Sequence, residues 1–143
     1  MNSFLLEIIT PLRVAYSDTV DMVTAPSASG IIGVLTHHTP LFTRLIEGEI
    51  KITNGKDEKY LAIGGGFMEV TKDRVSVLVS QAVHAHELNE EEIKKAQERA
   101  KQALAQNIKG SEFIEAQGLL RRSSLELKLL QRHRHRSKPS MSS

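Results

Sequence analysis

The adjacent histidines His37 and His38 are the first residues in this sequence whose types could do chemistry, as metal ligands or as proton carriers. They follow a glycine-punctuated apolar run in the stretch GIIGVLTHHTP. Adjacent residues of an extended segment point to opposite faces, and no cluster of Asp, Glu or His stands nearby at ligand spacing, so the two rings cannot share one ion. Pro40 favours an extended Thr39. We therefore interpret this segment as a loop that leaves a strand and is suited to contact another protein.

The remaining histidines do not make a stronger case for a metal. His84 and His86 stand two residues apart on one face of a predicted strand, but the sequence offers no third ligand. We interpret them as polar residues at the junction between a strand and a helix. His133 and His135 lie near the C-terminus and are expected to bind nickel or zinc only adventitiously. The sequence therefore predicts no metal site.

Three consecutive glycines, Gly64 to Gly66 in AIGGGFMEV, could let backbone N–H groups approach a phosphate. A phosphate loop needs Gly-Lys-Ser/Thr, and a dinucleotide fingerprint needs a following helix, whereas the following FMEVTKDRVSV has the alternation of strands. We expect a bulge or a sharp strand crossover here instead. No serine, histidine and carboxylate stand in a motif context, and the chain has no cysteine. We therefore predict no enzyme and no cofactor.

The elements that position these residues change character along the chain. Up to about Val83, short β-branched segments alternate with turn residues, a pattern typical of an all-β sandwich or flattened barrel of antiparallel strands. Asn54-Gly55 is a hairpin-turn signal. We predict three parts: a sandwich domain over residues 1–86, an antiparallel αα-hairpin over residues 87–131, and a disordered basic tail over residues 132–143.

The predicted hairpin has marked ends and a weak interior. Asn89 suits an N-cap, Glu92 can complete a capping box, and Gly110 suits a helix stop before Ser111 begins the second helix. The inner face of the first helix is largely alanine, which buries little apolar area at ~25 cal/mol per Å². The hairpin should therefore be only marginally stable by itself.

Charge is distributed unevenly along a chain whose formal net charge is +2. From Leu119 onward the only acid is Glu126, while basic residues recur on a helix whose other face is apolar. Nucleic acid, an anionic membrane and an acidic protein groove are all candidate partners for this surface. No aromatic residue follows Phe113 to stack on bases, so protein is favoured over nucleic acid. The basic residues at issue are Arg121, Arg122, Lys128 and Arg132.

Several segments together resemble one family. SGIIGVLTHHTPL is similar to its stretch Gly-x-hydrophobic-Gly-Ile/Val-Leu-Pro-x-His-Ala-Pro-Leu, and YLAIGGGFMEV to its Gly-Gly-Phe/Leu-x-Glu-Val strand. RVSVLVSQAVHAHELNEEEIKKAQERAK resembles its strand-to-helix junction. The family is the ε subunit of the F-type ATP synthase, which is homologous to the mitochondrial δ subunit. The resemblance runs in order from Phe4 to about Gln131.

This resemblance implies a non-catalytic rotor subunit that couples rotation of the c-ring to the catalytic head. Its expected partners are the γ subunit, the c-ring and the α/β head, and its expected location is peripheral, on the cytoplasmic face of a bacterial membrane or the stromal face of a thylakoid. In bacterial members the hairpin can inhibit ATP hydrolysis. The residues it assigns to a loop facing the c-ring and γ are Ser29, Ile31, His38 and Thr39, and those it assigns to the catalytic head are Arg121, Arg122, Lys128 and Arg132.

The sequence departs from the family pattern at informative positions. Ile31 replaces a Glu that many bacterial relatives carry, Thr36 replaces the usual Pro, and Thr39 the usual Ala. At the positions of an Asp-x-x-Arg-Ala motif, which binds ATP in some members, stand Asn89, Glu92 and Ile93. An acid in place of the arginine predicts weak or absent nucleotide binding.

An alternative of another class is a free-standing adaptor that binds nucleic acid or an acidic protein through its basic C-terminus. Steeply salt-dependent binding to a generic duplex would favour that alternative. No stretch approaches the ~20 apolar residues of a membrane span, and the N-terminal run lacks the basic leader of a targeting peptide. We therefore expect a chain that reaches a membrane only through partners.

Overall fold

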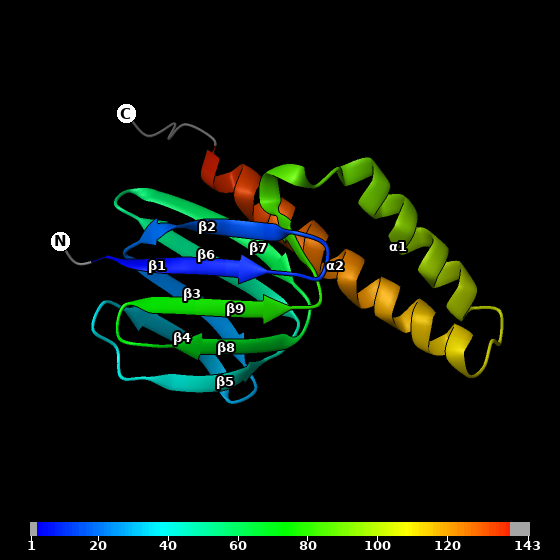
Figure 1. Cartoon of the computed structure of the whole chain (residues 1–143). Helices are drawn as coiled ribbons and strands as arrows, with labels where there is room; N and C mark the ends of the chain where they lie inside the picture. The colour runs from blue at the N-terminus through cyan, green and yellow to red at the C-terminus, as the bar shows by residue number, and fades with distance from the viewer. Residues whose placement is uncertain (1–2, 138–143) are drawn as a thin grey trace. The chain divides into compact units, whose positions relative to one another are not determined.

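The computed structural model describes residues 3–137, with side chains described to residue 133, and divides the chain into two compact units, Met1–His84 and Ala85–Ser143 (Figure 1). The first unit is built from ten strands. They are β1 (Phe4–Ile9), β2 (Val14–Val20), β3 (Met22–Ser27), β4 (Gly30–Leu35), β5 (Leu41–Leu45), β6 (Gly48–Asn54), β7 (Asp57–Ile63), β8 (Gly66–Val70), β9 (Arg74–Val79) and β10 (Ala82–His84).

The strands pair in the order β10-β7-β6-β3-β5-β8-β9-β1-β2, and β4 pairs with β3 beside this path. Every pair is antiparallel except β1 with β9, which run parallel. Figure 1 shows the strands as two layers wrapped around a common interior. The predicted all-β sandwich or flattened barrel is thus confirmed.

The alternation of the sequence explains which face of each strand is buried. In β1 the buried residues are every second one, and in β9 Val75, Val77 and Val79 face inward while Leu78 is 53% exposed. The core is mainly aliphatic, and Met68 and Phe4 are also part of it. Its largest fully buried side chains are Leu6, Ile8, Leu45, Ile50, Ile52, Leu61, Ile63, Met68, Val20, Val23 and Val34.

The glycine run lies where the chain crosses from β7 to β8, two strands that are not neighbours in the sheet, so the predicted strand crossover is found here and the backbones pack closely. A Cβ at Gly66 would overlap the carbonyl oxygen of Leu78 on β9, and one at Gly64 would overlap Ser80. The Gly64 N–H donates to the Gln81 carbonyl at 3.0 Å, and the Ser80 N–H donates to the Gly65 carbonyl at 3.0 Å. These amides are therefore engaged by the neighbouring backbone and are not directed at an anion.

The β6–β7 hairpin differs in detail from the prediction. Asn54 pairs with Asp57, so the two-residue loop is Gly55-Lys56, one residue later than the Asn-Gly signal suggests. Gly55 has φ 65°, and its N–H donates to Asp21 Oδ2 at 2.6 Å. The Asn54 amide donates to the Thr19 carbonyl at 3.2 Å, so that side chain ties the turn to β2.

The second unit contains a short 3-10 helix η1 (Ala85–Glu87) and the helices α1 (Glu90–Leu104) and α2 (Ser111–Ser137). Asn89 caps α1 as predicted: its side chain accepts from the Glu92 N–H at 3.2 Å. Ile93, Ala100 and Ala116 are buried. None of the helices in the described part of the chain is both long and apolar enough to span a bilayer.

Two helix ends depart from the sequence analysis. α1 ends at Leu104, well before Gly110, because Asn107 takes a left-handed conformation (φ 58°) and the Gln106 N–H bonds back to the Ala103 carbonyl. α2 continues to Ser137, past the boundary at Gln131 where a disordered tail was expected. No helix breaker occurs between 132 and 137, and Pro139 is the next one. Residues 138–143 of the expected tail lie outside the described residues.

We predict that Gly66→Ala lowers the stability of the sandwich by about 2 kcal/mol, because the added methyl group overlaps backbone that cannot move aside. Urea unfolding followed by tyrosine fluorescence measures this selectively, since both tyrosines, Tyr16 and Tyr60, belong to the first unit and the chain has no tryptophan. Gly118→Ala is the control. Gly118 lies in α2, where an added Cβ meets only Arg121 Nη2 at an ordinary contact distance of 3.9 Å, so this variant should not lower the tyrosine-detected midpoint.

Candidate partner-binding surfaces

The outward face of four adjacent strands carries a continuous apolar strip. Phe67 on β8 pairs with Leu78 on β9, and Leu78 pairs with Ile9 on β1. Phe42 on β5 stacks against Phe67, with ring centroids 5.5 Å apart and planes 19° apart. Phe42, Phe67 and Leu78 are 65%, 47% and 53% exposed. We call Ile9, Phe42, Phe67 and Leu78 the outer apolar surface. Exposed, contiguous aromatic and aliphatic groups of this kind mark protein interaction sites.

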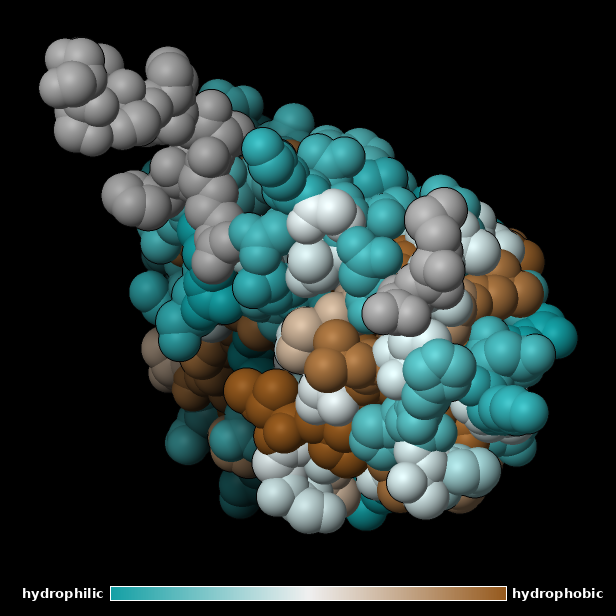
Figure 2. Space-filling model, turned by 90° about the vertical axis from the view of Figure 1, so that its left-hand side faces the viewer, coloured by the Kyte–Doolittle hydropathy of each residue, from teal (hydrophilic) through white to brown (hydrophobic). Residues whose placement is uncertain are grey.

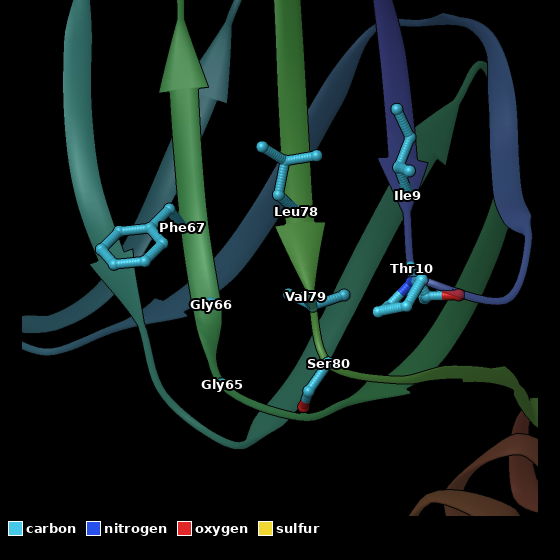
Figure 3. Close-up of a pocket in the computed structure, with 9 residues that line it drawn as sticks. Ile9, Thr10, Gly65, Gly66, Phe67, Leu78, Val79 and Ser80 are labelled. Atoms are coloured by element: carbon cyan, nitrogen blue, oxygen red, sulfur yellow. The ribbon is translucent and has the colours of Figure 1, made fainter.

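A shallow groove of about 460 Å³ adjoins this surface (Figure 3). In the close-up, the side chains of Ile9, Leu78 and Phe67 stand on three neighbouring strands, and Gly65 and Gly66 present only backbone. The lining offers two hydroxyls, those of Thr10 and Ser80, but no titratable group. Such a groove fits the apolar side chains of a partner, and it contains no group for acid–base chemistry.

Charged residues of both signs border the outer apolar surface, and exposed Arg44 on β5 pairs with Phe67. The register places Glu69 beside Phe42, Ser76 beside Glu69, and Glu7 beside Ser76. Glu7 is paired with Arg74 in a salt bridge. A polar rim next to an apolar centre is the usual anatomy of a protein interface.

The four residues predicted for the contact loop do not form one site. Ser29 and Ile31 lie at the β3–β4 turn and the start of β4, whereas His38 and Thr39 follow its end. Four residues of β4 follow Ile31 before the strand ends, which at about 3.3 Å per residue puts roughly 13 Å of strand between Ile31 and the loop that holds His38 and Thr39. Ile31 is 81% exposed. The pairs therefore belong to opposite ends of the sandwich, and each is available to a different contact.

The loop between β4 and β5 holds a strained residue. His37 has φ 65°, a left-handed conformation that costs free energy in a residue with a side chain. The His38 ring nitrogen Nδ1 lies 2.7 Å from the Thr39 carbonyl oxygen. A cavity of about 480 Å³ next to the loop is lined by Asp21, Leu35, Thr36 and His37. The view of this end of the sandwich shows apolar surface between polar patches (Figure 2).

His84 contacts the backbone and an aromatic ring of β2. His84 Nε2 lies 2.6 Å from the Ala15 carbonyl oxygen, and its ring centroid is 6.4 Å from that of Tyr16. Burial, together with the charge of Asp18, raises the pKa of Tyr16, so its hydroxyl stays protonated at neutral pH. Within residues 3–137 there is no group of three metal-ligating side chains.

The basic residues of α2 divide between two faces. Arg121, Lys128 and Arg132 are exposed and recur at i, i+7 and i+11, which places them on one stripe of the helix. Arg122 is half-buried and points about 100° away from them. We call Arg121, Lys128 and Arg132 the basic stripe.

Comparison with known proteins assigns the chain to a family. Residues 3–85 match the family model described as "ATP synthase, Delta/Epsilon chain, beta-sandwich domain". The chain belongs to the ATP synthase delta/epsilon family. It is 40% identical over 132 residues to the ATP synthase epsilon chain of Herpetosiphon aurantiacus, covering 92% of this chain and 96% of that one. It is 42% identical over 108 residues to that of Desulforamulus reducens, covering 76% and 80%.

Solved structures share the fold of this epsilon-type chain. A chain in the cryo-EM structure of the Euglena gracilis mitochondrial ATP synthase, OSCP/F1/c-ring, matches with a TM-score of 0.66 at 19% identity, covering 95% of this chain and 82% of that one. A chain in the Tetrahymena thermophila central stalk/c-ring structure matches with a TM-score of 0.53 at 15% identity. The resemblance found in the sequence is confirmed, and with it the interpretation as an accessory subunit that is not itself an enzyme.

The positions of the family's ATP-binding motif have other roles in this epsilon-type chain. The Asn89 side chain caps α1 by accepting from the Glu92 N–H, and Ile93 is 6% exposed. Glu92 brings a negative charge to the first turn of the helix, where a nucleotide phosphate would be repelled. Weak or absent nucleotide binding stays a prediction.

Sequence reasoning missed the outer apolar surface. Phe42, Phe67 and Leu78 are far apart in sequence, and each stands in an ordinary alternating strand. The sequence did contain one signal for this surface. Phe67 and Leu78 are large apolar residues at the strand positions that alternate with the buried Met68 and Val77, so their side chains point outward. Only the register of the four strands shows that these outward-facing apolar residues meet on one face.

We predict that His37→Gly stabilises the sandwich by about 1 kcal/mol, because glycine adopts the left-handed conformation without steric strain. Urea unfolding detected by tyrosine fluorescence measures the gain. His38→Gly is the matched control: its backbone has no positive φ to relieve, so added freedom in the unfolded chain should leave it no more stable than the parent. Equal gains in both variants would show that strain at His37 is not the cause.

Proposed function

We propose that this chain is the non-catalytic ε-type rotor subunit of an F-type ATP synthase, coupling rotation of the c-ring to the catalytic head through γ. The observation that carries the proposal is its relationship to an ATP synthase epsilon chain over 92% of its own length and 96% of the relative's. Both units are included in that match, so the proposal covers the sandwich and the helices. The proposed location is peripheral, on the cytoplasmic face of a bacterial membrane or the stromal face of a thylakoid, through the complex.

The outer apolar surface is the proposed γ-binding site. It lies on regular strands, so its side chains are held in fixed positions before binding, which lowers the entropy cost of association. Phe42 and Phe67 supply aromatic anchors, the residue type that dominates binding energy at protein interfaces. The groove beside Phe67 can receive an apolar side chain of γ, and exposed Glu69 at the rim favours a basic residue opposite it.

The two ends of β4 are assigned to different neighbours. His38 and Thr39 lead directly into β5, which carries Phe42, so they fit the same partner as the outer apolar surface, namely γ. Ser29 and Ile31 lie at the opposite end and fit the c-ring. Ile31 makes the proposed contact with the c-ring apolar. Many bacterial relatives carry a Glu at this position instead.

The helical unit is the proposed regulatory element. The inner face of α1 packs through small residues such as Ala100, which bury little area, so two arrangements of the hairpin can differ by only a few kcal/mol. The basic stripe is the proposed contact with acidic parts of the catalytic head. Arg122 was assigned to the same contact, but it is half-buried on another face, so we place it at the margin of this surface.

We predict that Phe67→Glu weakens binding to γ at least 100-fold, because a carboxylate buried against apolar groups loses its hydration. The measurement is the dissociation constant of the full chain with a γ-containing catalytic head stripped of its own small subunit. Phe113→Glu is the control, since Phe113 is also partly exposed (39%) but lies on α2. Similar losses in both variants, or none in Phe67→Glu, would place the γ contact elsewhere.

We predict that the full chain inhibits ATP hydrolysis by that head and that Arg121→Glu/Lys128→Glu relieves the inhibition at least tenfold, while binding changes less than twofold. Charge reversal removes attraction to acidic residues and adds repulsion. Lys95→Glu, an exposed lysine on α1, changes the charge elsewhere on the same unit and should inhibit like the parent. If the parent binds without inhibiting, the subunit serves assembly and coupling only.

A further inference from the structure

The strand β4 has a partner on one edge only. It pairs with β3 from Met22↔Leu35 to Ser27↔Gly30 without a register shift, and no strand within residues 3–137 pairs with its other edge. An edge strand of this kind offers unpaired backbone groups to another strand. Its free edge is therefore a template for β-pairing.

The usual protection of edge strands is missing from β4. Natural edges carry charges, prolines or bulges, whereas GIIGVL has none of these. Indeed no Asp, Glu, Lys or Arg occurs between Asp21 and Arg44. Ile31 is 81% and Leu35 56% exposed, and both stand on the outward face, opposite Pro26 and Met22 of β3. Covering this edge would remove exposed apolar side chains from water.

The strand is also complementary to itself. In antiparallel pairing with a second copy, residues of one face must meet residues of the same face. A two-fold axis at Gly33 sets Ile31 opposite Leu35 of the second copy on the outer face, and Ile32 opposite Val34 on the inner face. Glycine meets glycine at the axis, where two larger side chains would crowd. Because the strand is neutral, no like charges are brought together.

We propose that the unassembled chain forms a two-fold symmetric dimer in which β4 pairs antiparallel with β4 of a second copy, centred on Gly33. The interface is small, one strand from each copy, so the dimer is weak and dissociates in the micromolar range. This inference goes beyond the proposed function, because it concerns the chain before assembly. Its consequence rests on that function: the dimer covers Ile31, so dimerisation and contact with the c-ring exclude each other.

Sedimentation velocity of the full chain from about 2 to 200 µM tests the dimer. We expect a concentration-dependent shift from monomer to dimer, abolished by Ile31→Glu, which brings a carboxylate to the paired edge. Ile114→Glu is the matched control, since Ile114 is 69% exposed on α2, and it should dimerise like the parent. A chain that stays monomeric throughout, or a dimer that Ile31→Glu leaves intact, overturns the proposal. Binding to γ is measured separately, so failure here is distinguishable from failure of the proposed function.

Disulfide cross-linking tests the register. The chain has no cysteine, so a single Gly33→Cys can form only an intermolecular disulfide. Directly opposed Cα atoms of an antiparallel pair lie about 4.5–5.5 Å apart, within disulfide range. The new Cβ meets the end of the flexible Met22 side chain at 3.0 Å and makes an ordinary contact with Thr24 Cγ2 at 3.8 Å. We expect at least tenfold faster oxidation to a covalent dimer than for Ile114→Cys. Equal oxidation rates in the two variants overturn the proposal. It is also overturned if the Gly33→Cys variant stays monomeric by itself and cross-links only to another subunit of the complex.

Discussion

The parallel pairing of β1 with β9 is the constraint on which the rest of the sandwich depends. It joins the first strand of the sheet to a strand some seventy positions later, from Leu5↔Arg74 to Ile9↔Leu78. It thereby brings Ile9 beside Leu78 and completes the outer apolar surface across β5, β8, β9 and β1. Because parallel strands cannot be joined by a short turn, β1 and β9 need a long connection, and the strands β2 to β8 form it.

The composition of the strands predicted the architecture but not the register. Alternation along the strands correctly predicted an all-β sandwich, and the strand crossover expected at the glycine run is found between β7 and β8. The outer apolar surface could not be predicted in the same way, because it depends on which strand lies beside which. The contact loop shows the same limit: four residues near in sequence lie at opposite ends of one strand.

Helix starts were easier to predict than helix ends for a physical reason. A start is fixed by a side chain that satisfies a free N–H, as Asn89 does, and few residue types can do this. An end requires only that one residue leave the helical conformation. Asn107 does so before Gly110, and the basic residues after Gln131 have no breaker that would stop α2. Boundaries inferred from composition alone therefore failed at both C-termini.

The distribution of charge separates the tasks of the molecule. The stretch from Met22 to Phe42 contains no Asp, Glu, Lys or Arg, and it includes the exposed β4 edge as well as Phe42 of the outer apolar surface. Charge is instead concentrated on the helices, where the basic stripe faces solvent. Apolar contacts on a rigid sheet favour permanent attachment, because they lose little entropy and are insensitive to salt. A charged stripe on a weakly packed hairpin favours reversible contact. Salt screens the attraction of the stripe, and rearranging the hairpin costs little free energy. In the proposed function, the outer apolar surface keeps the subunit attached to γ, and the basic stripe makes the reversible contact with the catalytic head.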